Sequence, residues 1–176
     1  MLKRTVFFWL SSFGLAAAGY YLLRLLLPGG HVFGAWYRML LYHETHPLAY
    51  IGLCCLCFGP LAAAAVRTWP QRSRGGRAGL VALLALGTVG LASPLGGMLW
   101  YWHDMRAGYF PADWLPPLLL QGSREGLMIG WLIVLLSVPY NVLGLLVSYR
   151  LLAVGARLFA PPAASSQLDN QLQQPG

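Results

Sequence analysis

Four long apolar stretches constrain this sequence more than any other feature. They cover residues 5–27, 47–66, 78–102 and 126–154. Each is close to the length of about 20 residues that a helix needs to cross the hydrocarbon core of a bilayer. Charged residues make up only 10% of the chain, against about 25% in a typical soluble domain. The sequence therefore predicts an all-α integral membrane protein, a bundle of four transmembrane helices with interfacial helices or loops on its outer face.

Basic residues predict the orientation of these spans. Eight of the 12 lysines and arginines lie before the first span, between the second and third, or at the end of the fourth. Those between the second and third spans are Arg67, Arg72, Arg74 and Arg77. In the other two loops, Arg38, Arg106 and Arg124 are balanced by four acidic residues. Because short cytoplasmic loops are enriched in lysine and arginine, we expect both termini in the cytoplasm and a multi-pass protein of the plasma or inner membrane. We expect the arginine loop to contact anionic lipid.

The net charge of +7 does not indicate a nucleic-acid partner, because the basic residues follow the predicted sides of the membrane. The expected partners are the lipid bilayer and either a membrane protein or further copies of this chain. Residues 1–159 form the predicted membrane domain, and the polar residues 160–176 form a predicted disordered cytoplasmic tail.

Both outer connections are predicted to hold structure. Apolar residues recur at helical spacing in residues 31–43, which is typical of a short helix lying in the interface. Residues 103–125 are apolar but contain Pro111, Pro116 and Pro117, so a cap or partial re-entrant loop is expected there.

Small residues inside the spans predict close packing of helices. Their spacing is that of the small-xxx-small pattern, which allows van der Waals contact between backbones in lipid. The residues are Gly14, Ala18, Gly87, Gly90, Gly96, Gly97, Gly126 and Gly130. The pattern leaves open which helix or partner each face meets.

The fourth stretch carries the polar residues of the membrane interior. Ser137, Tyr140 and Asn141 lie there, and they suit either hydrogen bonds between helices or contact with a substrate. We expect Ser123 to be the N-cap of this helix, with Glu125 in its first turn. On that assignment no aspartate, glutamate or lysine lies in the middle of a span, which argues against a proton-coupled pump.

All histidines fall on the predicted outer side. His43, His46, His103 and Asp104 would supply imidazole and carboxylate ligands for a divalent metal such as zinc, if the ends of the second and third spans adjoin. The alternative is that these polar residues lie in outer loops simply because water is there.

Cys54 and Cys57 have CxxC spacing in the second span. In a chain of four spans this resembles the quinone-linked disulfide-bond oxidoreductases of bacterial membranes. That family needs a second cysteine pair in an outer loop, whereas this chain has 3 cysteines in one run. The low dielectric of the membrane also disfavours a thiolate, so packing is the preferred interpretation.

The preferred function is non-enzymatic: a small accessory, regulatory or structural subunit that acts through association of helices. Two alternatives stay open. One is a metal-dependent enzyme using the outer histidines, and the other is a component of a transporter for a small apolar or lipid-like solute. No nucleophile motif, phosphate-binding loop or pair of intramembrane aspartates is present in the sequence.

Overall fold

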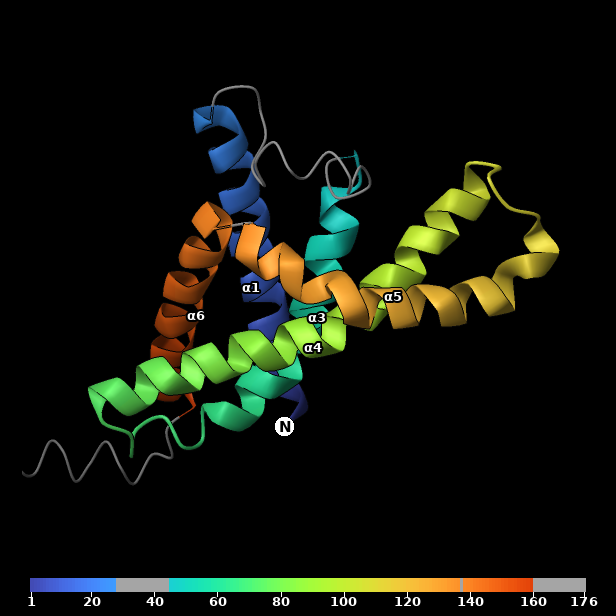
Figure 1. The fold of residues 1–176 in the computed structure, drawn as a ribbon. Helices are drawn as coiled ribbons and strands as arrows, with labels where there is room; N and C mark the ends of the chain where they lie inside the picture. Colours follow the sequence, from blue (N-terminus) through green and yellow to red (C-terminus); the bar gives the residue numbers. More distant parts are fainter. Residues whose placement is uncertain (28–44, 137, 160–176) are drawn as a thin grey trace, which may run out of the picture.

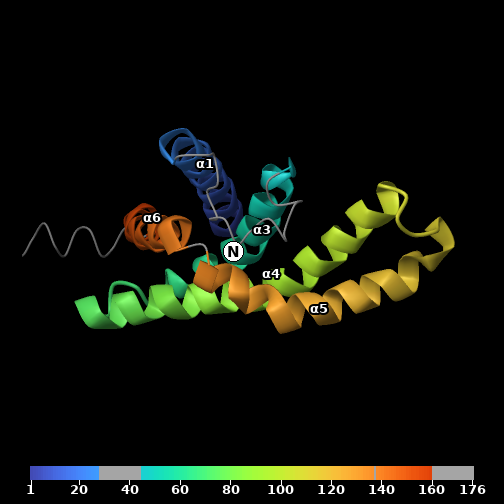
Figure 2. The same ribbon diagram turned by 45° about the horizontal axis from the view of Figure 1, so that its top comes forward.

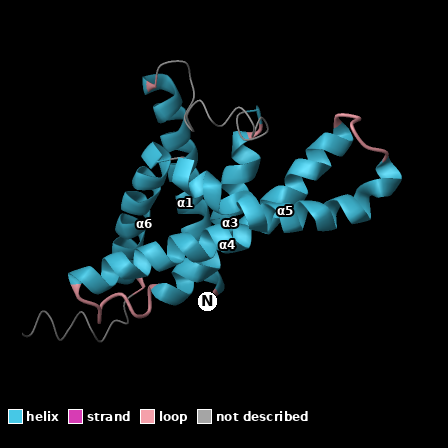
Figure 3. Cartoon of the chain, in the orientation of Figure 1, coloured by secondary structure: helices cyan, strands magenta, loops and turns pink. Residues whose placement is uncertain are grey.

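The computed structural model describes residues 1–27, 45–136 and 138–159. The described elements are all helical, with no strand among them (Figure 3). They are α1 (Leu2–Leu26), α3 (Pro47–Ala65), α4 (Arg74–Arg106), the 3-10 helix η3 (Ala112–Trp114), α5 (Leu115–Leu136) and α6 (Val138–Leu158). The expected interfacial helix at 31–43 and the tail at 160–176 lie outside the described residues.

Two groups of helices make up the fold (Figure 1). α1 packs against both α3 and α6, and these three helices run side by side. α4 and α5 form a long hairpin that crosses this group and extends beyond it in both views (Figures 1 and 2). α4 makes its most extensive contact with α5 and also packs against α3 and α6.

Four described helices are long and apolar enough to span a membrane, as the sequence predicted. They are Leu2–Leu26, Pro47–Ala65, Arg74–Arg106 and Tyr140–Leu158. The predicted fourth span at 126–154 is not one helix, however, because it is divided between the end of α5 and most of α6. Proline accounts for the division. Pro139 lies in the first turn of α6, where the N–H that proline lacks would have no partner within the helix. In the interior of a helix, the same proline would remove a hydrogen bond.

The loop expected at 103–125 is also mostly helical. α4 continues to Arg106, and α5 begins at Leu115 with Pro116 and Pro117 in its first turn. Ser123 is therefore not an N-cap, and Glu125 lies near the middle of α5 instead of in a first turn. The correction places a carboxylate inside a 22-residue helix of about 33 Å, a length close to the thickness of a bilayer core.

The basic regions share one end of the molecule, where the N-terminus, the α3–α4 connection and the end of α6 meet (Figure 1). Arg4 donates from Nη2 to the carbonyl oxygen of Phe159 at 3.4 Å. Arg77 donates from Nε to the carbonyl oxygen of Trp69 at 3.2 Å, and its guanidinium lies 5.6 Å from the centre of the Trp69 ring. Arg67, Arg72 and Arg74 are exposed. This end suits contact with anionic lipid, and its cytoplasmic location stays a prediction.

The main core lies toward the same end, between α1, α3, α4 and α6. Phe8, Ala62 and Leu152 are fully buried there. A second buried cluster, Tyr20, Ile51 and Cys55, holds α1 and α3 together farther along. In a bilayer, lipid would offer no hydrophobic drive between helices, and tight van der Waals packing of this kind would stabilise the group.

Glycines set the distance between α4 and α5. A Cβ added at Gly122 would lie 2.5 Å from the carbonyl oxygen of Gly97, and one added at Gly126 would collide with the backbone of Ser93. Gly130 meets the side chain of Ser93 in the same way. Gly122, Gly126 and Gly130 thus form one small-residue face of α5 that lies directly on α4. At Gly126 and Gly130, the close packing that the sequence predicted therefore occurs between two helices of this chain.

Candidate functional site

A groove of about 620 Å³, called the central groove here, lies between the α1, α3 and α6 group and the α4–α5 hairpin. Its wall is mainly apolar and takes residues from all five long helices. Leu15 and Cys54 line the groove, and both are exposed. The groove therefore reaches the surface that lipid would cover.

One face of α4 forms an unbroken wall of the groove. Its lining residues recur at intervals of three and four: Ala85, Thr88, Val89, Ala92, Ser93, Gly96, Gly97, Trp100, Tyr101 and Asp104. This is the spacing of a single helical stripe, and from Ala85 to Asp104 it extends about 28 Å along the axis. Within this stripe, Ser93 and Gly97 lie against α5, whereas a Cβ added at Gly96 would meet nothing within 4 Å. Large aromatic rings begin only at Trp100.

Polar residues gather at one end of this stripe. The acidic end, as we call it, comprises Trp100, Tyr101, Asp104, Phe110 and Glu125, all of which line the groove. Tyr101 donates from its hydroxyl to Oε2 of Glu125 at 2.9 Å, and Gln121 donates from Nε2 to Oε1 at 2.8 Å. Both donors are neutral, so they orient the carboxylate without cancelling its charge.

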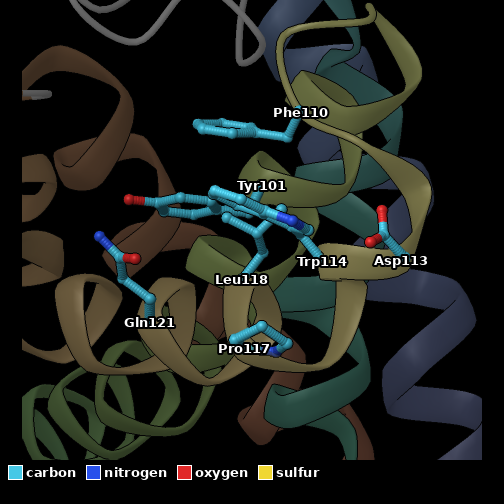
Figure 4. A pocket seen from close by; sticks show the side chains of 7 residues that line it. All are labelled: Tyr101, Phe110, Asp113, Trp114, Pro117, Leu118 and Gln121. Carbon is cyan, nitrogen blue, oxygen red and sulfur yellow. The ribbon is translucent and has the colours of Figure 1, made fainter.

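A smaller pocket of about 420 Å³ adjoins the acidic end (Figure 4). It is lined by Tyr101, Phe110, Asp113, Trp114, Pro117, Leu118 and Gln121. The rings of Tyr101 and Phe110 stack with centroids 6.1 Å apart and planes inclined by 25°. Because these two residues line both spaces, the pocket and the central groove share a wall of aromatic rings.

Comparisons with known protein families, with curated proteins and with solved structures found no match. The functional argument therefore rests on the geometry of the groove.

The polar residues predicted in the middle of the fourth span have different roles. Tyr140 donates from its hydroxyl to the carbonyl oxygen of Ala16 at 3.0 Å, which ties α6 to α1. Both Tyr140 and Asn141 line the central groove. Ser137 lies outside the described residues. Tyr140 thus bonds two helices together, whereas for Asn141 a role in contacting a solute stays open.

The proposed metal ligands are brought together only in part. The rings of His46 and His103 stack at a centroid distance of 4.3 Å and an angle of 2°. His43 lies outside the described residues. Within the described ranges, no group of three or more histidine, cysteine, aspartate or glutamate side chains is placed to hold a metal ion. Parallel stacking does not aim two imidazole nitrogens at one point, and tetrahedral ligation requires such convergence.

The three cysteines are free thiols. Cys54 is exposed, while Cys55 and Cys57 are buried, and Cys54 and Cys55 contribute to the wall of the groove. Cys55 packs at the wall of the groove, and Cys57 is buried away from it.

Two features of the groove were not predicted from the sequence: the place of Glu125 in its wall and the small-residue stripe of α4. The stripe was detectable, because its i, i+3, i+4 spacing is present in the sequence. The place of Glu125 was not, since it depends on α5 beginning at Leu115.

Proposed function

We propose that this protein binds a small apolar or lipid-like solute in the central groove, as a component of a membrane transporter. The observation that carries the proposal is an elongated, mainly apolar space of about 620 Å³ formed by five helices. Sites for small molecules commonly have volumes of about 300–1,000 Å³ and apolar walls with a few polar groups. The exposed lining residues Leu15 and Cys54 give a lipid-soluble molecule a route from the bilayer.

A buried hydroxyl in the groove supports the same function. Oγ1 of Thr88 is buried and has no hydrogen-bond partner among the described residues. Such a group is costly to leave unsatisfied, and Thr88 lines the groove about 20 Å along α4 from Tyr101. A solute with a polar atom at this depth would satisfy the hydroxyl, as would rotation toward a helix carbonyl.

Binding is tested by narrowing the groove from one side. A Cβ added at Gly96 would meet no other helix or side chain within 4 Å, yet Gly96 lines the groove, so Gly96→Phe should place its ring in the empty space. We expect this variant to lower crosslinking of a photoreactive single-chain fatty alcohol by about tenfold, a loss equal to about 1.4 kcal/mol of binding. The crosslinked peptide is identified by mass spectrometry and should come from the groove wall.

Gly90→Phe is the matched control for this experiment. Gly90 lies on the same helix, also has open space around an added Cβ, and does not line the groove. It should crosslink as the original chain does. Equal crosslinking of both variants, or crosslinked peptides from outside the groove, would contradict a solute site in the groove.

Association through helices is a second candidate function, and one observation favours it. Gly14 and Ala18 are exposed four residues apart on α1, and a Cβ added at Gly14 would meet no other helix or side chain within 4 Å in the described part of the chain. These residues are therefore not used in the internal packing that occupies Gly126 and Gly130. A small-xxx-small face in this position suits contact with a second copy of the chain.

The association is tested by fluorescence energy transfer between labelled copies in lipid vesicles. Gly14→Ile separates two α1 helices that meet at this face, so we expect the dimerisation constant to fall by about tenfold. Gly79→Ile is the control, because an added Cβ at Gly79 also meets open space but lies at the basic end of α4. No transfer in the original chain, or the same transfer in both variants, counts against self-association through α1.

A further inference from the structure

Two carboxylates line the acidic end of the central groove. Asp104 and Glu125 both line it, whereas its described lining residues include no lysine, arginine or histidine. The nearby guanidinium of Arg106 lies 5.0 Å from the centre of the Trp102 ring, and Trp102 is not part of the wall. Arg124 is exposed, and it does not line the groove either. The electrostatic field at this end therefore favours a cation.

The position of Glu125 makes that preference strong. Its neighbours Gly122 and Gly126 lie against the backbone of α4, so the carboxylate sits where two helices are closest. Tyr101 and Gln121 fix its two oxygens, and neither donor is charged. Inside a bilayer, a carboxylate held in place with no counter-ion among the described residues would interact with an incoming opposite charge far more strongly than it would in water.

Aromatic rings line the same end of the groove. Trp100, Tyr101 and Phe110 contribute faces or edges to the wall of the groove, and Figure 4 shows the Tyr101 and Phe110 rings lying one above the other. Trp114 extends this surface in the adjoining pocket. Aromatic faces attract ammonium groups within about 6 Å of the ring centre, and a combination of such rings with a carboxylate is typical of sites for alkylammonium ions.

The remainder of the groove fits an apolar chain. From Gly96 back to Ala85, the wall formed by α4 consists of small residues and extends about 17 Å, beside the positions Ser93 and Gly97 at which α5 lies against α4. An ammonium group at Glu125 would place its chain along this wall, toward Thr88 and the surface near Leu15.

From these contacts we infer that the central groove selects a cationic amphiphile, with an ammonium headgroup beside Glu125 and an apolar chain along the small-residue wall of α4. The inference rests on the proposed function, because it specifies the chemical class of the solute that the groove binds. It assigns Glu125 the role of the residue that determines charge specificity.

The test compares three photoreactive probes with the same chain and different headgroups: a primary alkylamine, an alcohol and a carboxylate. The purified full-length protein is crosslinked with each probe in a neutral maltoside detergent, and crosslinking is measured over a concentration series. We expect the amine to bind about tenfold more tightly than the alcohol, and the carboxylate to bind most weakly. In Glu125→Gln, the ratio of amine to alcohol affinity should fall to about one, because the amide still accepts a hydrogen bond from Tyr101 but carries no charge.

Arg124→Gln is the control for the loss of a charge from α5, since Arg124 is exposed and does not line the groove. It should keep the preference for the amine. Asp104→Asn serves as a second variant if Glu125→Gln does not fold, and it should also reduce the preference. Equal affinity for the amine and the alcohol in the original chain would overturn the cation selectivity while leaving the proposed function standing. Absence of groove crosslinking with every probe would overturn both.

Discussion

Gly126→Ala is expected to destabilise the protein by about 3 kcal/mol, the upper part of the range for overpacking of a well-packed site. The added Cβ would collide with the carbonyl oxygen of Ser93, and it would also lie 3.2 Å from the backbone nitrogen of Gly97. Both obstacles are backbone atoms of α4, so no side chain can rotate away, and α4 and α5 must separate. The change is measured by reversible unfolding in mixed detergent micelles, as a loss of free energy of unfolding.

Gly90→Ala is the control, because it makes the same substitution in a helix interior where the added Cβ has open space. Its intrinsic effect on helix stability should be favourable by about 0.5–1 kcal/mol. Opposite signs for the two variants are the signature of backbone contact between α4 and α5. If Gly126→Ala were as stable as Gly90→Ala, the backbones of α4 and α5 could not be in contact at Gly126.

The sequence predicted the helical class and the number of candidate spans because both depend on local composition. The stretches at 5–27, 47–66 and 78–102 correspond closely to α1, α3 and the central part of α4. The hydrophobic length of a segment is sufficient to identify a span of this kind. The helices that pack against the segment do not have to be known.

The division of the fourth stretch was harder to predict, because proline has two opposite meanings. Pro60 and Pro94 lie inside α3 and α4, and those helices continue through them. Pro116, Pro117 and Pro139 instead lie in the first turns of α5 and α6. Whether proline starts a helix or is tolerated inside one depends on what satisfies the freed carbonyl, and that is decided by packing.

The groove could be predicted even less, since it is formed between helices that are distant in the sequence. Gly97, Gly126 and Gly130 were identified as packing residues, but their partner was unknown until α5 was placed beside α4. The same hairpin brings Glu125 to Tyr101. Periodicity along one helix shows which residues share a face, whereas the space between two faces depends on the crossing of the helices.

Truncation of Phe8, in the core at the basic end, is expected to cause the second large loss of stability. Phe8 is fully buried, and its ring lies against Gly155 of α6, where an added Cβ would be 3.0 Å from Cε1. Phe8→Ala should destabilise the protein by about 3 kcal/mol, at the lower end of the range for buried phenylalanine, because lipid removes the hydrophobic drive but not the cost of the cavity. The measurement is the free energy of unfolding in mixed detergent micelles.

A double-mutant cycle with Gly155→Ala separates this contact from a general loss of packing. Alone, Gly155→Ala should destabilise the protein by about 1–2 kcal/mol, because its methyl group presses on the Phe8 ring. In the Phe8→Ala background that ring is absent, so the alanine at position 155 should cost nothing and its helix propensity should make it slightly favourable. The coupling between the two sites is then about 1–2 kcal/mol, well above the value for independent positions. Additive effects would mean that α1 and α6 do not meet through Phe8 and Gly155. The relative placement of these two helices, which form one side of the central groove, would then be wrong.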